Sequence, residues 1–209
     1  MKYSWVMICA LSACGGGGGG GGGGSGGVDP RLARLDIYAA QNLRVLGDPA
    51  IGVPAMPMMP DASLPDGGMV AFVGSAAIRV EVPDAPIVLF GDATVTLDFD
   101  LGTSGGRVTN VFGETTGGNI ADYTGEVILS GGAPAADLKV GYAGTLNGGG
   151  TTLVFDGMLA GDLLGDPLGA LAIADLEAAI ETDGVPQSGT IIVVAEKTAP
   201  PPDPPTITP

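Results

Sequence analysis

The sequence predicts a mainly β protein, a small antiparallel eight-stranded up-and-down β-barrel preceded by one amphipathic helix. Short runs rich in β-branched and aromatic residues recur between Met69 and Lys197, and glycine, asparagine or aspartate turns separate them. The runs follow one another about every 12–16 residues, too closely for crossover helices, so successive strands should pair antiparallel. The 38 glycines and the positive mean hydropathy also favour a glycine-rich β protein over a disordered acidic chain.

The first residues predict export. Lys2 precedes an apolar run from Trp5 to Leu11, which has the length of a signal-peptide core and is too short to span a membrane. The run ends in Leu11-Ser12-Ala13-Cys14, which resembles the bacterial lipobox. The resemblance implies that residues 1–13 are a lipoprotein signal peptide and that Cys14 is acylated, with palmitate among its acyl chains. An ordinary signal peptide with a chance cysteine is the alternative.

Residues 14–27 are interpreted as the acylated cysteine and a glycine-rich tether. Every residue from Gly15 to Gly27 is glycine except Ser25, so the segment buries no apolar surface and should be a flexible coil. Gly15 stands where some bacteria use an aspartate to retain lipoproteins in the inner membrane. We therefore expect a lipid-anchored protein of the cell envelope, at the outer membrane and either periplasmic or surface-exposed.

The charge and the composition exclude several function classes. Eight Lys and Arg residues against 23 Asp and Glu residues give a net charge of −15, which excludes nucleic acid as a partner. The absence of histidine removes the commonest general base and metal ligand. Cys9 leaves with the signal peptide and Cys14 is acylated, so no free thiol or disulfide is expected. We expect no enzyme activity, no cofactor and no metal site.

A helix is predicted within residues 28–47. Asp29 suits the N-cap, Pro30 suits the first helical position, and Gly47 suits the residue after the last turn. The helix should therefore span residues 30–46 and pack on the barrel or plug one of its ends. Apolar residues at helical spacing should face the barrel, namely Leu32, Leu35, Ala39, Leu43 and Leu46. The charged residues Arg34, Asp36 and Arg44 should face solvent.

Residues 48–68 form a Pro/Met-rich linker with five prolines, which obstruct helix and central-strand pairing. Met56, Met58 and Met59 lie within this segment. A buried crossing segment is the favoured interpretation, and an adaptable methionine-lined binding surface or a copper site is the alternative.

Residues 69–197 should form the barrel domain. The first two strand runs are interpreted as one bent strand, which brings the count to eight, enough to close a barrel filled by its own side chains. A two-sheet sandwich is the competing architecture. Residues 175–181 could form one helical turn, and residues 198–209 should be a Pro-rich disordered tail. The runs are Met69–Gly74, Ala76–Val82, Ala93–Phe99, Arg107–Phe112, Thr124–Leu129, Lys139–Leu146, Thr152–Ala160, Leu168–Ala174 and Thr190–Ala195.

Three stretches together resemble the barrel of transferrin-binding protein B-like lipoproteins. They are Ala93-Thr-Val-Thr-Leu-Asp-Phe-Asp100 with Gly106-Arg-Val, Tyr123-Thr-Gly-Glu-Val-Ile-Leu with Gly144-Thr-Leu, and Gly161-Asp-Leu-Leu-Gly-Asp-Pro-Leu-Gly-Ala170. The resemblance covers about residues 69–197, one barrel. It implies an acylated, solute-binding-like lipoprotein, often exposed on the cell surface, that binds host or solute molecules. Receptor contacts in this family lie in loops that this sequence does not match, so no ligand-binding residue is carried over.

Several residues suggest chemistry, but each has a simpler interpretation. Residues 102–106 spell G-x-S-x-G around Ser104, yet they lie between two predicted strands in a chain without a histidine base, which indicates a hairpin turn. Two sets of aspartates could bind a hard cation or supply the carboxylate pair of a glycosidase. The sets are Asp92 with Asp98 and Asp100, and Asp162 with Asp166. The favoured interpretation is that these are solvated surface residues. The large aromatic residues should be core or rim residues: Tyr38, Tyr123, Tyr142, Phe72, Phe90, Phe99, Phe112 and Phe155.

The sequence therefore predicts a membrane-anchored bacterial lipoprotein whose barrel is a non-catalytic binding or surface-interaction module. The expected partners are membrane lipid, through acylated Cys14, and a protein or a small solute. A structural envelope lipoprotein without a small ligand is the alternative, and a carboxylate-based hydrolase is a more remote one.

Overall fold

The structure is a computed structural model that describes residues 29–83, 85–114 and 120–198. The predicted signal peptide, Cys14 and the glycine-rich tether lie outside the described residues, as does the predicted tail after Thr198. Within the described part of the chain, none of the helices has the length and apolar character needed to cross a membrane.

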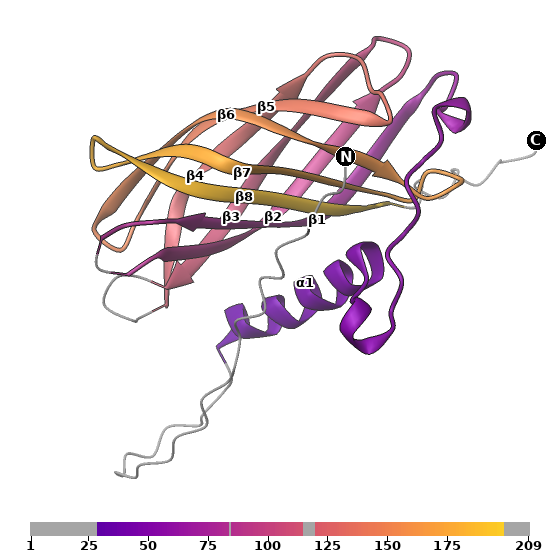
Figure 1. Cartoon of the computed structure of the whole chain (residues 1–209). Coiled ribbons are helices and arrows are strands. Elements are labelled where there is room, and N and C mark those ends of the chain that lie inside the picture. The colour runs from indigo at the N-terminus through magenta and orange to yellow at the C-terminus, as the bar shows by residue number, and fades with distance from the viewer. Residues whose placement is uncertain (1–28, 84, 115–119, 199–209) are drawn as a thin grey trace, which may run out of the picture.

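Eight antiparallel strands form a closed barrel (Figure 1). Each strand pairs with the next one along the chain, and β1 pairs with β8 over Phe72–Val80 to complete the wall. This confirms the predicted meander and excludes the two-sheet sandwich. The strands are β1 (Met69–Val80), β2 (Ile87–Asp98), β3 (Thr103–Glu114), β4 (Ile120–Gly131), β5 (Asp137–Gly148), β6 (Thr151–Leu164), β7 (Ala170–Thr182) and β8 (Val185–Lys197).

The inside of the barrel is filled by its own side chains. Alternate residues point inward with period two, so that Val95 and Leu97 of β2 are fully buried while Thr94 of the same strand is exposed. Large apolar residues from all parts of the wall meet in one core cluster, among them Phe72, Leu89, Phe155, Leu159 and Ile173. A close-packed interior of this kind stabilises the barrel and leaves partners to be met at its outer surface.

Glycines on the inner face let the wall curve. A Cβ on Gly106 of β3 would collide with the backbone carbonyl of Thr94 on β2, and a Cβ on Gly74 would collide with that of Val194 on β8. Neighbouring strands therefore approach more closely at these points than a side chain would permit, as strongly coiled sheets require.

The linker before β1 packs against one end of the barrel. Met59 is buried in the core cluster, and its N–H donates to the carbonyl of Leu163 at 2.8 Å. Gly165 donates in the same way to the carbonyl of Pro57 at 2.8 Å. The interpretation as a buried crossing segment holds only at Met59, because Met56 is half-buried, Met58 is 63% exposed and most of residues 48–68 are exposed. Short 3-10 turns, η1 (Pro49–Ile51) and η2 (Asp61–Ser63), lie within this linker.

One predicted local element is wrong. Residues 175–181 form no helical turn, because they continue β7 to Thr182. The strand is irregular here: Leu176 and Glu177 stand opposite Thr190 alone in the pairing of β7 with β8. The Glu177 N–H donates to the carboxylate of Asp175 at 3.1 Å, which supplies the local hydrogen bond that the strand ladder lacks.

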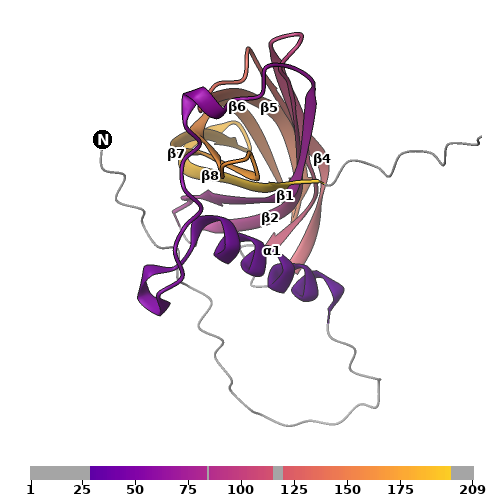
Figure 2. The ribbon, with the colours of Figure 1, turned by 90° about the vertical axis from the view of Figure 1, so that its right-hand side faces the viewer.

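Helix α1 (Pro30–Leu46) has the predicted bounds and lies along the outside of the barrel rather than in its mouth (Figures 1 and 2). The side chain of Asp29 accepts from the Arg31 N–H at 2.9 Å, as an N-cap does, and the Gly47 N–H donates to the Leu43 carbonyl at 3.0 Å. The helix crosses the barrel obliquely, from the beginning of β4 at its N-terminus to the beginning of β7 at its C-terminus.

Candidate functional site

Two shallow hollows of the described outer surface lie between the first half of α1 and strands β3 and β4. The register of β3 against β4 shifts between Val108 and Val111, and Asn110 has a positive φ of 51° at this irregularity. An irregularity of this kind bends a strand locally. The two open hollows adjoin beside it, with volumes of about 540 and 440 Å³. Their linings come from the start of α1, from Thr109–Val111 and from Asp122–Gly125.

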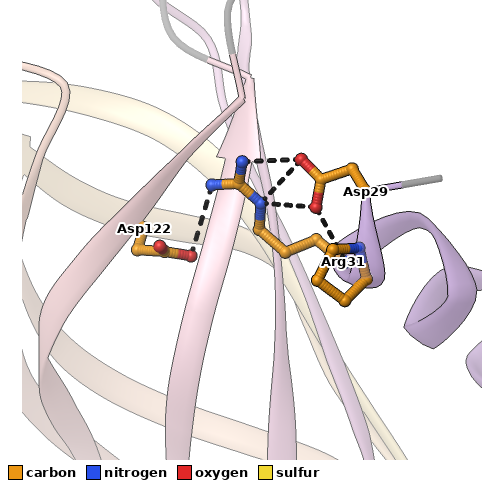
Figure 3. Close-up of a pocket in the computed structure, with 4 residues that line it drawn as sticks. Asp29, Arg31 and Asp122 are labelled. Carbon is orange, nitrogen blue, oxygen red and sulfur yellow. Dashed lines mark hydrogen bonds and ion pairs between the residues drawn. The ribbon is translucent and has the colours of Figure 1, made fainter. Parts of the chain in front are cut away.

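Arg31 joins the start of the helix to the barrel at this groove (Figure 3). Its guanidinium forms a two-pronged ion pair with the N-cap Asp29, with Nε to Oδ1 at 2.9 Å and Nη2 to Oδ2 at 2.6 Å. Its other terminal nitrogen, Nη1, lies 3.5 Å from the carboxylate of Asp122 on β4. The hydrogen bonds from the Arg31 side chain and backbone lower the pKa of Asp29 to about 2.

One turn further along α1, Arg34 and Tyr38 dock on β2 and β3. The Tyr38 hydroxyl donates to the Asp92 carboxylate at 2.5 Å, and Arg34 Nη2 lies 3.1 Å from the same carboxylate. Asn110 donates to the other oxygen of Asp92 at 2.8 Å, and Arg34 also donates to the Asn110 carbonyl at 2.9 Å. The Arg34 guanidinium lies 4.7 Å from the centre of the Phe112 ring, a cation–π contact.

These contacts fix the charge states of the groups at neutral pH. Burial and the hydrogen bond to Asp92 raise the pKa of Tyr38 to about 12, so its hydroxyl remains a donor. Partial burial by itself would raise the pKa of Asp92. The hydrogen bonds from Tyr38 and Asn110 and the charge of Arg34 outweigh it, so the pKa of Asp92 is lowered. The cluster is therefore an ionised carboxylate held by one cation and two neutral donors.

The second half of α1 docks through Gln41, Arg44 and Val45. Gln41 donates to the Val73 carbonyl on β1 at 2.9 Å, and Arg44 forms a two-pronged ion pair with Glu196 on β8, the shorter contact being 2.6 Å. Val45 is fully buried in a small apolar cluster with Leu164, Ala170, Ala172 and Val194. The helix is thus held by ion pairs along most of its length and by apolar packing at its C-terminal end.

The predicted bounds of α1 are right, and its predicted facing is right only in part: Leu46 packs on the apolar cluster around Val45 as expected. Leu32 and Ala39, expected against the barrel, are exposed, and Leu35, Leu43 and Leu46 are half-buried. Arg34, expected in solvent, packs inward, and Arg44 reaches back to Glu196, while Asp36 is exposed as predicted. The reason is that the barrel wall under α1 presents Asp92, Glu196 and the Val73 carbonyl of β1. Polar side chains of the helix hydrogen-bond to these groups, whereas leucines could not.

The polar docking residues Arg31, Arg34, Tyr38 and Gln41 were missed as a group. They follow one another at intervals of three or four along α1, with Val45 next, which is a regular helical stripe. The chain has only eight Lys and Arg residues and four tyrosines. The gathering of two arginines and a tyrosine on one stripe of the helix was therefore the sequence signal that could have indicated a polar docking face.

The two predicted carboxylate groups do not come together. Asp98 and Asp162 lie on the outer faces of β2 and β6, which are four strands apart in a closed wall of eight. Asp98 caps the turn after β2 by accepting from the N–H groups of Asp100 and Leu101 at 3.0 and 2.8 Å. Asp92 serves α1 instead, and Asp166 is exposed in the turn after β6.

Asp162 has a neighbouring carboxylate that the sequence analysis did not connect with it. It stands directly opposite Asp137 in the pairing of β5 with β6. Burial and, to a smaller extent, the charge of Asp137 raise the pKa of Asp162. Among the residues that the structure describes, no group of three or more His, Cys, Asp or Glu side chains could hold a metal ion.

Ser104 and Tyr142 have structural partners. Ser104 is buried in β3, and its hydroxyl donates to the Gly132 carbonyl at 3.2 Å. Of residues 102–106, which were predicted as a hairpin turn, only Gly102 lies in the turn, because the strand already begins at Thr103. Tyr142 points into the barrel and lies over Gly157, where its ring occupies the space that a side chain at that position would need. Its hydroxyl donates to the carboxylate of Asp175 on β7 at 2.8 Å. Six of the eight aromatic residues predicted for the core or rim are buried, and Phe90 and Phe99 are half-buried.

Comparisons with known proteins identify no relative. No family model, no curated protein and no solved structure matches this chain. The groove at α1 can therefore be interpreted only from its own residues: it is a network of paired charges in which Asp122, with 73% of its side chain exposed, is the carboxylate most available to a partner.

Proposed function

We propose that this chain is a membrane-anchored bacterial lipoprotein whose barrel is a non-catalytic binding or surface-interaction module, acting outside the cytoplasm at the outer membrane. The observation that carries the proposal is the filled interior. Because large apolar side chains such as Phe72, Phe155 and Leu159 occupy the centre of the barrel, a partner must bind at the outer surface or at the loops.

The anchor is the acyl group that the lipobox resemblance implies at Cys14. Two or three acyl chains hold a soluble domain stably at a bilayer, where one chain would not. The glycine-rich segment then leads to Asp29, which the Arg31 ion pairs fix against α1 and β4. Any pull from the membrane thus acts on the barrel through a docked helix rather than directly on a strand.

The charge of the module indicates the kind of partner. With a net charge of −15, the surface repels anionic polymers and favours cationic solutes or basic patches on proteins. The groove beside α1 adds an exposed carboxylate, Asp122, next to the guanidinium of Arg31. The resemblance to transferrin-binding protein B-like lipoproteins supports the same class of function and names no ligand for this chain.

The anchor is tested by metabolic labelling with palmitate in a bacterium that processes lipoproteins. The wild-type chain should incorporate label and Cys14→Ala should not, with both chains at equal abundance. Label in both chains, or in neither, contradicts the anchor.

The binding role is tested on intact cells and on the exported Cys14→Ala chain. Surface protease should cleave the wild-type chain on whole cells if the barrel faces the medium, whereas full protection moves the module to the periplasmic side. Native mass spectrometry of the Cys14→Ala chain, recovered from its own cells, should show an additional bound mass. A chain that carries no bound mass from cells or medium favours the structural envelope role instead.

A further inference from the structure

The outward face of α1 is apolar and has no partner in the described structure. Ile37 is 66% exposed and Leu32 is 41% exposed, and the alanines beside them at positions 33, 39 and 40 are also exposed. Asp36 is the one acidic residue on this face. The turn η1 that follows the helix lies on the same side of the barrel (Figures 1 and 2), and its Ile51 is 66% exposed.

The position of α1 in the chain brings this face close to a bilayer. Fourteen residues separate Cys14 from Asp29, the N-cap of α1. A flexible glycine-rich coil of that length has a root-mean-square span of roughly 20 Å. That distance is about the length of α1 itself, roughly 25 Å at 1.5 Å per residue. The tether therefore holds the N-terminal end of α1, together with the start of β4 beside it, within about the length of the helix from the anchor.

The charge of the helix also sets it apart from the rest of the surface. Residues 30–46 contain three arginines and one aspartate, in a chain whose net charge is −15. Each arginine is paired with a carboxylate, Arg31 with the N-cap Asp29, Arg34 with Asp92 and Arg44 with Glu196, so much of the acidic charge in this region is compensated. Anionic headgroups should therefore repel this region less than they repel uncompensated acidic surface.

From these observations we infer that the outward face of α1 is a lipid-contacting surface, with Leu32 and Ile37 lying at the headgroup level of the bilayer. The barrel then rests on its side against the membrane, with the wall of β5 and β6 turned away from the lipid. Apolar residues on one face of a helix that lies in the interface plane contribute to membrane binding in this manner. This inference rests on the proposed function, because the acyl anchor supplies the proximity.

The test places an environment-sensitive fluorophore on single cysteines of the acylated chain. Ile37→Cys reports the inferred contact, and Val154→Cys on β6, an apolar residue that is 37% exposed, is the matched control on the opposite wall. The proteins are inserted in vesicles of phosphatidylcholine and phosphatidylglycerol in equal parts, with and without spin-labelled lipid. The label at residue 37 should shift to shorter wavelength and be quenched several-fold more than the label at residue 154.

Two results overturn the inference while leaving the anchor intact. The first is equal quenching at the two positions in protein whose mass shows the acyl chains. The second is a blue shift at residue 37 that grows with protein concentration in the Cys14→Ala chain without vesicles, which would make this face a contact between two copies. A mass without acyl chains overturns the proposed function as well, so the two failures are distinguishable.

Discussion

Tyr38 is the residue on which the docking of α1 most depends. Its hydroxyl donates to Asp92 and accepts from Arg34, and the side chain is buried between the helix and the barrel wall. A hydroxyl that links a carboxylate to a guanidinium takes part in charge-assisted hydrogen bonds, which are stronger than neutral ones. Removing it leaves Asp92 with one donor fewer in a half-buried position.

We therefore expect Tyr38→Phe to lower the free energy of unfolding by about 1–2 kcal/mol, because the lost hydrogen bonds involve charged groups. Urea denaturation followed by circular dichroism measures the change. Tyr123→Phe is the control: Tyr123 is also buried, and in the described structure its hydroxyl donates to no other residue. A loss for Tyr123→Phe as large as that for Tyr38→Phe would contradict the role assigned to the Tyr38 hydroxyl.

The helix as an element shows which features the sequence predicts and which it does not. The bounds of α1 agree with the prediction because the signals are local: Asp29 caps the first turn and Gly47 follows the last. The buried face is decided by the barrel wall, which is distant in sequence, and there Asp92 and Glu196 select Arg34 and Arg44 over the leucines. The same reason applies to residues 175–181, which have helical character alone but form ladder pairs in β7.

The candidate site was harder to predict than the fold for a related physical reason. Alternation of apolar and polar residues within a strand predicts the inner and outer faces of the barrel without knowledge of the neighbouring strands. A groove between a helix and a wall depends on which outward residues of β2, β3 and β4 come to lie under α1. No pattern within Asp92, Asn110 or Asp122 alone shows that they share one partner helix.

Acid should weaken the docking of the whole helix. The pKa of Glu196 is lowered chiefly by the hydrogen bond from Arg44, and the pKa of Asp92 is also lowered. A carboxyl whose folded pKa lies below its unfolded pKa contributes stability that is complete above the unfolded value, near about 4, and is lost as the pH falls through the folded value. Stability supplied by this element should therefore decrease as the pH falls below about 4.

The variant Asp92→Asn isolates the contribution of the Asp92 carboxylate to this pH-dependent stability. The wild-type chain should unfold at a higher urea concentration than this variant at about pH 7. The difference between the two should shrink as the pH falls below about 4 and through the lowered pKa of Asp92. Asp162, whose raised pKa acts in the opposite direction, is present in both chains and cancels in the difference. A difference that is independent of pH would show that Asp92 contributes by shape rather than by charge.

At the scale of the whole molecule, closure of the barrel depends on how tightly its wall can curve. Inward-facing glycines occur on most of the strands, at positions where a Cβ would strike the neighbouring strand: Gly74, Gly91, Gly106, Gly113, Gly125, Gly144, Gly157, Gly161 and Gly189. Apart from those in turns and loops, the glycines are concentrated in two places, the segment after Cys14 and the inner face of the barrel. The second is a requirement of the closed architecture, because eight strands around a solid core must coil strongly.

Adjacent glycines on β3 allow this requirement to be measured. A Cβ on Gly106 would collide with the Thr94 carbonyl, which belongs to a paired strand and cannot rotate away, whereas a Cβ on Gly105 would meet the Leu129 carbonyl at an ordinary 3.6 Å. Neither glycine has a positive φ, so alanine is compatible with the backbone conformation at both positions. We expect Gly106→Ala to destabilise the protein by about 1–3 kcal/mol, as overpacking does. We expect Gly105→Ala to change stability by less than about 0.5 kcal/mol, as surface substitutions usually do. Thermal unfolding of the two variants decides the matter: equal losses would mean that strand propensity, and not the curvature of the closed wall, accounts for the glycines.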